Sequence, residues 1–211
     1  MTRLRARLGL PAGAPSAPVN VRPVFHGFSP LVVPRPEDWP SWVEVAGYWW
    51  PARPDNWQPP AELVDFLQAG PPPVFVGFGS MAAGWADLKG CGADVLSIGD
   101  VPHDWLFPRT AAVVHHAGAG TTAAGLRAGV PAVPVPVMAD QPFWASRLYT
   151  LGVAPRPVPF QKLTAEALGD AITTCLSEPS HRRLAAELAR RITAEDGTTS
   201  LLAHISSTNA G

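Results

Sequence analysis

Short apolar runs alternate with stretches of helical periodicity from Val74 to the end of the chain. The runs are four to six residues long, which is typical of strands buried on both faces of a parallel sheet. The helical stretches between them supply the crossovers that such a sheet needs. We therefore predict an α/β fold, a parallel sheet with flanking helices, with strands at Val74–Phe78, Val95–Ile98, Ala111–Val114, Ala132–Val137 and Val153–Val158.

Two features of this pattern refine the prediction. Pro134 and Pro136 each remove a ladder donor, which suits a central strand poorly. Thr164 can cap the helix that follows it, and Leu163 and Leu168 have the spacing of a hydrophobic staple. Helices are predicted at Thr121–Ala128, Pro142–Leu151, Thr164–Leu176 and about Ser180–Ile192.

The stretch before Val74 differs in composition. More than half of the 25 prolines and five of the eight tryptophans lie there. The prolines favour extended backbone, and the tryptophans need a surface that covers them. Residues 1–60 therefore form either a connector against a neighbouring domain or a segment whose tryptophans pack on the rest of this chain.

Composition excludes several classes of function. The net charge of -1 gives no electrostatic reason for nucleic-acid binding. Cys91 and Cys175 are the only cysteines, too few for a disulfide framework, so we expect a cytoplasmic protein. No apolar stretch is long enough to span a membrane. A small molecule is the expected partner.

An anion site is predicted where the run Val113–Val114 enters a turn of small residues. A histidine at the strand end, His115 or His116, can donate to an anion, while Gly118 and Gly120 allow close backbone approach. Thr121 and Thr122 add hydroxyl donors at the start of a helix, whose dipole favours negative charge. A diphosphate fits best, although such turns also serve helix packing. Since neighbouring strand residues face opposite sides, only one of the two histidines is expected to meet the ligand.

Two more polar turns follow predicted strands. Gly77–Met81 carries glycines and the hydroxyl of Ser80, and it can face the same ligand across the sheet edge, or the glycines can simply permit a tight turn. Asp140 and Gln141 precede the next helix and can hold vicinal sugar hydroxyls by bidentate hydrogen bonds. Asp140 can equally be a helix N-cap.

These motifs resemble the UDP-glycosyltransferase superfamily. The runs His115–Pro131 and Ala139–Trp144 are similar to its donor signature, in particular to sterol 3-beta-glucosyltransferases and to bacterial enzymes that glycosylate glycopeptide and macrolide natural products. Further similar landmarks are His26–Pro30, Gly47–Pro51, Gly77–Met81 and Gly99–His103. The resemblance implies the C-terminal, Rossmann-like half of a GT-B fold, with residues 1–60 as a remnant of the acceptor domain and linker and 61–211 as the donor domain.

The resemblance also implies a function. A hexose would pass from a nucleoside-diphosphate sugar such as UDP-glucose to a hydroxyl of a lipophilic acceptor, with inversion and without an obligatory metal or other cofactor. By position, Asp140 and Gln141 would hold the sugar, and Val101, Pro102 and His103 would border the base. The diphosphate would be bound by Ser80, His116, Gly118, Gly120, Thr121 and Thr122.

The sequence departs from this family in three places. Ala124 stands where many members carry a glutamate that binds the ribose. The segment 82–93 is too short for a helix and strand found in the family, so one βα unit is expected to be missing. The N-terminal domain, which carries the general base in the family, is also expected to be missing, and His26 is not assigned that role. We expect no catalytic base in this chain and incomplete activity in isolation.

Two other functions fit parts of the sequence. Gly118–Ala123 satisfies the dinucleotide fingerprint, and Asp140 lies at about the distance expected for a ribose contact, so an NAD-binding oxidoreductase fragment is one alternative. A non-catalytic module that binds nucleotide sugars is the other. Binding of NAD rather than UDP would indicate the oxidoreductase fragment. Binding of a nucleotide sugar without turnover would indicate the non-catalytic module.

Overall fold

The computed structural model describes residues 23–79, 92 and 94–209. Two predictions fall outside the described residues: the role of Ser80, and most of the segment 82–93 where a βα unit is expected to be missing.

A parallel sheet of three strands forms the centre of the molecule. The strands are β3 (Val74–Gly77), β4 (Ala112–His115) and β5 (Ala132–Pro134), in the order β3-β4-β5. Each pair is parallel, so all three carboxyl ends meet at one edge. All residues of the central strand β4 are buried. The predicted fold class is confirmed.

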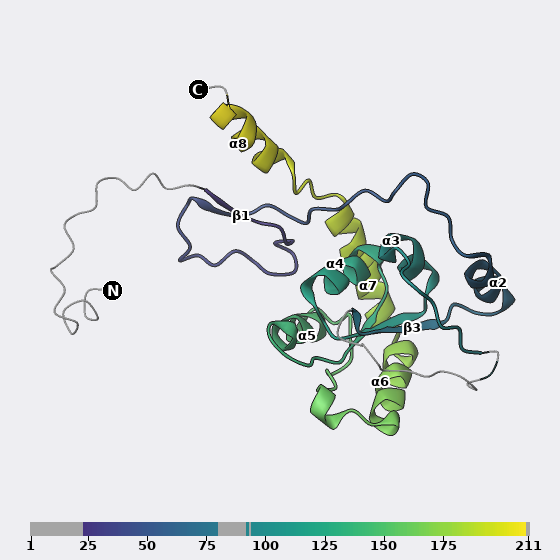
Figure 1. The fold of residues 1–211 in the computed structure, drawn as a ribbon. Helices are drawn as coiled ribbons and strands as arrows, with labels where there is room; N and C mark the ends of the chain where they lie inside the picture. The colour runs from purple at the N-terminus through teal and green to yellow at the C-terminus, as the bar shows by residue number, and fades with distance from the viewer. Residues whose placement is uncertain (1–22, 80–91, 93, 210–211) are drawn as a thin grey trace, which may run out of the picture.

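The two faces of this sheet are covered by different helices (Figure 1). Because strand residues alternate, Val113 packs among residues of α2 (Ala61–Ala69), α3 (His103–Leu106) and the 3-10 turn η2 (Phe107–Arg109) on one face. On the other face Val114 packs against α6 (Ala165–Ser177). A third cluster joins helices α4 (Ala119–Ala128), α5 (Gln141–Thr150) and α7 (Pro179–Thr193).

All four predicted helices are present as α4 to α7, with ends within two residues of the prediction. Thr164 caps α6 as expected, because its Oγ1 accepts a hydrogen bond of 3.1 Å from the N–H of Ala167. Leu163 and Leu168 both pack in the cluster beneath the sheet. Helix α4 ends at Gly129, whose φ of 70° is the left-handed conformation that terminates many helices.

The prediction of a strand at Val95–Ile98 is wrong. This segment belongs to no strand, although Leu96 and Ile98 pack against the cluster that contains Val113. The apolar residues of this run therefore cover a buried cluster without forming a strand. A strand also needs a ladder partner, and none is found for this segment among the described residues.

The strand predicted at Val153–Val158 is also wrong, but this segment does run beside β5. Ala132 donates its N–H to the carbonyl of Val153 at 3.1 Å, and Val158 donates to the carbonyl of Pro134 at 3.0 Å. Pro155 and Pro157 lie between these bonds and have no N–H to donate, which prevents a continuous ladder. The 3-10 turn η3 (Phe160–Lys162) follows.

The described part of the N-terminal segment, residues 23–60, packs on the rest of the chain. It forms a small parallel pair of strands, β1 (Val24–His26) and β2 (Val43–Val45), and the loops after each strand reach the cluster around α5 and α7. Trp50 lies beside Arg127 of α4, and Trp57 beside Trp105 of α3, so this chain covers both. Trp42 stays 42% exposed. The domain boundary at residue 60 remains a prediction.

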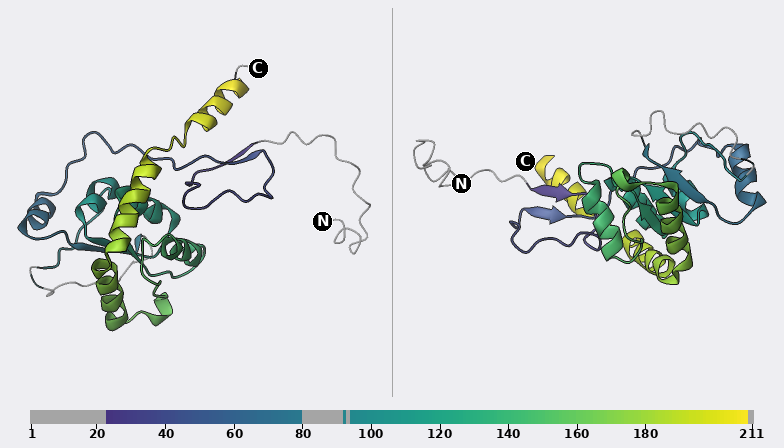
Figure 2. Two further views of the ribbon diagram at one scale, coloured as in Figure 1. Left: turned by 180° about the vertical axis from the view of Figure 1, so that it is seen from behind. Right: turned by 90° about the horizontal axis from the view of Figure 1, so that it is seen from below.

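Two hydrogen bonds join this N-terminal segment to the chain after α7, where the two segments cross. Ser29 donates to Oε1 of Glu195 at 2.7 Å, and Nε1 of Trp49 donates to the carbonyl of Gly197 at 2.7 Å. The last helix, α8 (Thr199–Asn209), begins just beyond this crossing and lies beside β1, away from the three-stranded sheet (Figure 2). Among the described helices, none is both long and apolar enough to cross a membrane.

Candidate nucleotide-sugar site

The turn after β4 presents an uncapped helix start at the carboxyl edge of the sheet. Helix α4 begins at Ala119, and its N-cap residue is Gly118, which has no side chain to cap the N–H groups of the first turn. Ala119 and Gly120 are exposed there, and an added Cβ on Gly120 would meet only open space. The first N–H groups of a helix have no partner within it and attract negative charge. The start of α4 is therefore open at this edge, and anion binding there stays a prediction.

His116 lies between two strand-end turns. A Cβ atom added to Gly118 would collide with Nε2 of His116, and a Cβ added to Gly79 would lie 3.3 Å from its Cε1. Gly79 follows β3 and Gly118 follows β4, so the imidazole contacts both turns. This is the juxtaposition that the sequence suggested for the turns after the first two strands of the sheet.

His115 has the opposite environment. It is fully buried, and its Nδ1 accepts a hydrogen bond of 3.1 Å from the N–H of Ala117. Burial lowers the pKa of His115 to about 3, with smaller contributions from His116 and His103. The imidazole is therefore neutral at pH 7. The expectation that one of the two histidines packs in the sheet is confirmed for His115, whereas contact of His116 with a ligand stays a prediction.

Asp140 lies within electrostatic reach of His116. Burial lowers the pKa of His116, and the negative charge of Asp140 opposes that shift. Asp140 occupies the N-cap position of α5 but makes no capping bond; its Oδ2 instead accepts a bond of 2.8 Å from Nε1 of Trp144. The structure thus brings His116 and Asp140, one predicted diphosphate residue and one predicted sugar residue, together at one edge.

Gln141 is buried and its amide oxygen holds the backbone. Oε1 accepts hydrogen bonds from the N–H groups of Val137 at 2.8 Å and Met138 at 3.0 Å. These two bonds fix the turn that leads to Asp140. A direct contact of Gln141 with a sugar stays a prediction.

The two threonines of the turn differ in exposure. Thr121 is half-buried near the surface, whereas Thr122 is only 1% exposed and its Oγ1 is buried without a partner. The hydroxyl of Thr122 therefore points toward the interior of the domain. A phosphate contact through its backbone remains compatible with this arrangement.

The predicted base-bordering loop leads into α3. Val101 is buried in the core, Pro102 is the N-cap of α3, and the ring of His103 stacks on Phe107 at 4.3 Å. Burial lowers the pKa of His103, opposed by Asp100 and Asp104. Of the three side chains, those of Pro102 and His103 are partly exposed, so they alone can border a ligand.

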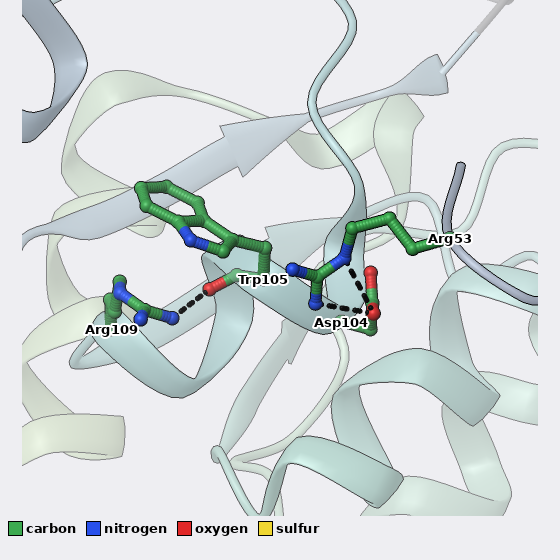
Figure 3. A network of polar contacts seen from close by, with 4 residues as sticks. All are labelled: Arg53, Asp104, Trp105 and Arg109. Atoms are coloured by element: carbon green, nitrogen blue, oxygen red, sulfur yellow. Dashed lines mark hydrogen bonds and ion pairs between the residues drawn. The ribbon is translucent and has the colours of Figure 1, made fainter. Parts of the chain in front are cut away.

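A polar network holds α3 in place (Figure 3). Arg53 donates to Oδ2 of Asp104 from Nε at 3.1 Å and from a terminal nitrogen at 2.6 Å. Arg109 lies over the ring of Trp105 and donates to its carbonyl at 2.6 Å. Asp104 also lines a cavity of about 270 Å³ together with Ala124 and Arg127. Charged groups therefore adjoin position 124, where the sequence lacks an acidic residue.

Sequence reasoning missed two features of the site. Ala117 and Ala139 have φ values of 61° and 54°, and among the described residues no other non-glycine residue has a positive φ. Nothing in the sequence signals this, because alanine has no preference for that conformation. The bond between Trp144 and Asp140 was also not predicted, although their spacing of four residues places both on one side of a helix.

The described residues offer no evident metal site. Within residues 23–79 and 94–209, no group of three or more His, Cys, Asp or Glu side chains is placed to hold a metal ion. The prediction of a metal-independent reaction stays untested.

Comparison with known proteins points to one group. The chain is 40% identical over 225 residues to O-mycaminosyltylonolide 6-deoxyallosyltransferase of Streptomyces fradiae, covering 93% of this chain and 53% of that protein. It is also 40% identical over 202 residues to a sterol 3-beta-glucosyltransferase of Arabidopsis thaliana, covering 82% and 32%. The chain therefore spans about half or less of the length of these relatives.

Solved structures show the same fold. The glycotransferase of kitacinnamycin matches with a TM-score of 0.67 and 21% identity, over 97% of this chain and 59% of its own. The glycosyltransferase VinC, solved in complex with DTDP, matches with a TM-score of 0.55 and 24% identity, over 70% and 44%. These likenesses support the predicted GT-B architecture.

A family model supplies the assignment. It matches residues 82–206, a range that includes the turns after β4 and β5. This chain belongs to the family described as Erythromycin biosynthesis protein CIII-like, C-terminal domain.

Proposed function

We propose that this chain binds a nucleoside-diphosphate sugar at the carboxyl edge of β3, β4 and β5 and forms the donor half of a glycosyltransferase. The observation that carries the proposal is the position of His116 between the turns at Gly79 and Gly118, beside the uncapped start of α4. A hydrogen-bond donor and a helix N-terminus that converge on one point suit a diphosphate.

The diphosphate would bind across these two turns. The first N–H groups of α4 and the imidazole of His116 would donate to its oxygens, with Gly120 allowing close approach. Thr121 would add a hydroxyl, and Thr122 would contribute its backbone. As the bond between the sugar and the diphosphate breaks, negative charge grows on the leaving oxygen, and these donors stabilise it.

The sugar would lie over the turn after β5. The carboxylate of Asp140 is exposed and can accept hydrogen bonds from sugar hydroxyls, while its bond from Trp144 fixes its orientation. Pro102 and His103 would border the base at the opposite side of the edge. Ribose contacts remain open, because Ala124 offers no polar group.

The overall reaction follows from the relatives. A hydroxyl oxygen of the acceptor would form a bond to the anomeric carbon, the bond from that carbon to the diphosphate would break, and a general base would take the hydroxyl proton. Two relatives are named for a macrolide and for sterols, so we propose a lipophilic acceptor and a role in natural-product biosynthesis. We also propose a cytoplasmic setting, which the low cysteine content supports. No residue of this chain is proposed as the base.

Calorimetric titration with dTDP, UDP, UDP-glucose and NAD tests the proposal. We expect a nucleoside diphosphate to bind and His116→Ala to weaken it, while the matched variant His204→Ala, on α8, binds as the native protein does. Failure of a folded protein to bind any of the diphosphates would contradict the proposal. The NAD alternative gains no support from the named relatives, and tight NAD binding that Asp140→Ala abolishes would revive it.

A further inference from the structure

Ala117 sits in a backbone conformation that alanine seldom adopts. Its φ of 61° is left-handed, and its side chain is fully buried. For a residue with a Cβ this conformation is unfavourable and persists only where the surroundings fix it. Ala117 comes directly between His116 and Gly118, so its conformation sets where the turn and the start of α4 point.

One contact can fix this conformation. Nδ1 of the buried His115 accepts the hydrogen bond from the N–H of Ala117, two residues later, at 3.1 Å. Because an acceptor nitrogen carries no proton, the neutral ring has its hydrogen on Nε2. A side chain that accepts from the N–H two residues on is the device by which Asx turns stabilise local backbone.

The neighbouring strand carries a similar arrangement. Ala139, after β5, is the second left-handed alanine, with φ of 54°. The residue that holds its turn is Gln141, through the N–H groups of Val137 and Met138. In both turns a buried side chain accepts from the backbone beside a left-handed alanine, which indicates a shared structural solution at this edge.

We propose that His115 is a positioning residue whose Nδ1 locks Ala117 in the left-handed conformation and so preassembles the cradle for the diphosphate. This inference rests on the proposed function, because it assigns a role within that site. His115 itself would touch no ligand, since it is fully buried. Its effect would pass through the backbone of residues 117–120 and through the placement of His116.

Three variants test this role. His115→Asn keeps an acceptor that can reach the N–H two residues on, His115→Leu removes it, and Ala117→Gly in the His115→Leu background removes the penalty of a positive φ. The first readout, made without nucleotide, is hydrogen exchange of the Ala117 amide, with the Val113 amide in β4 as the reference for global stability.

We expect the Ala117 amide to exchange slowly in the native protein and in His115→Asn, and at least about tenfold faster relative to Val113 in His115→Leu, as for the loss of one buried hydrogen bond. If the exchange rate of the Ala117 amide relative to Val113 is the same in His115→Leu as in the native protein, His115 does not fix the conformation of Ala117.

The second readout is the affinity for dTDP, measured by calorimetry. We expect His115→Leu to bind about fivefold to tenfold more weakly, His115→Asn to bind nearly as the native protein does, and Ala117→Gly to restore most of the loss. If His115→Leu binds as tightly as the native protein, the positioning role is wrong. The native protein could bind no nucleotide while His115→Leu still exchanges its Ala117 amide faster. In that case the proposed function is wrong, but the hydrogen bond from His115 does fix the conformation of Ala117.

Discussion

The turns after β4 and β5 each contain one buried side chain that fixes the backbone and one neighbouring residue at the edge of the sheet, but in opposite order along the chain. After β4 the buried residue that bonds to the backbone, His115, comes first, and the residue at the edge, His116, follows it. After β5 the order is reversed, with Asp140 at the edge and the buried Gln141 after it. Each turn therefore pairs one side chain that fixes the backbone with a neighbour available to a ligand.

The difference between the turns lies in burial and charge. The β4 turn is buried around Ala117 and presents backbone N–H groups with a histidine, which suits an anion. The β5 turn is exposed at Ala139 and presents a carboxylate, which suits hydroxyl groups. The two chemistries lie close enough for Asp140 to influence the pKa of His116. Position along the sheet edge thus separates the expected diphosphate and sugar subsites.

The largest expected effect is that of Gly118→Ala. The backbone of Gly118, with φ of -66° and ψ of 147°, suits any residue, so the cost comes from the collision of the new methyl group with His116. Displacing that ring should weaken dTDP binding by about tenfold to hundredfold, the equivalent of ordinary overpacking. Calorimetry on Gly169→Ala, an exposed helical glycine with open space around it, provides the matched control. Equal affinities for the two variants would show that His116 is not confined by this turn.

Acid should destabilise the β4 turn through His115. Its pKa of about 3 lies below the ordinary value of 6.5, so between these values the unfolded chain binds more protons and stability falls as the pH falls. From pH 7 to pH 5 the native protein should lose about 2 kcal/mol through this group. Urea unfolding at both pH values should show a smaller loss for His115→Asn. An identical loss in both proteins would contradict a buried, neutral His115.

Nucleotide affinity should also depend on pH, through His116. Burial holds its pKa below the ordinary range in the free protein, and a bound diphosphate would raise it. Binding therefore takes up a proton, and affinity should rise as the pH falls through the range between the two pKa values, by about threefold to tenfold over one unit. Titrations of His116→Ala at the same pH values correct for protonation of the nucleotide. A slope that survives in this variant would assign the proton to another group.

The smallest effect separates the two left-handed alanines. Ala139→Gly should raise the free energy of unfolding by about 0.5 kcal/mol, because glycine tolerates a positive φ. Ala117→Gly should leave it nearly unchanged, because the same gain is offset by about 0.8 kcal/mol for a lost buried methyl group. Urea denaturation of both variants measures the difference. Equal gains for the two variants would mean that the burial of the Ala117 methyl group contributes little.

The sequence predicted the features that depend on local chemistry. The apolar run before His115 and the small residues after it defined β4, its turn and α4, and Thr164 marked the start of α6. Prediction failed where tertiary partners decide the outcome. Val95–Ile98 is a short apolar run, as in a buried strand, but it has no ladder partner among the described residues. Pro155 and Pro157 interrupt pairing beside β5.

The site shows the same division. The residue types at the edge were readable from the turn motifs, but their roles depend on which side chains the fold buries. The sequence predicted that Gln141 holds a sugar, which stays a prediction, but it did not predict that the amide oxygen of Gln141 holds Val137 and Met138. The sequence does not predict the left-handed conformations of Ala117 and Ala139, because they follow from contacts that only the folded chain makes.

The central claim is that the edge between the two turns recognises a diphosphate through His116. The most direct test is calorimetric titration of the native protein and of His116→Ala with dTDP and with dTMP, which differ by one phosphate. We predict that the native protein binds dTDP more tightly than dTMP and that His116→Ala removes most of this advantage. Equal affinity for the two nucleotides, or an advantage that His116→Ala leaves intact, would contradict the claim.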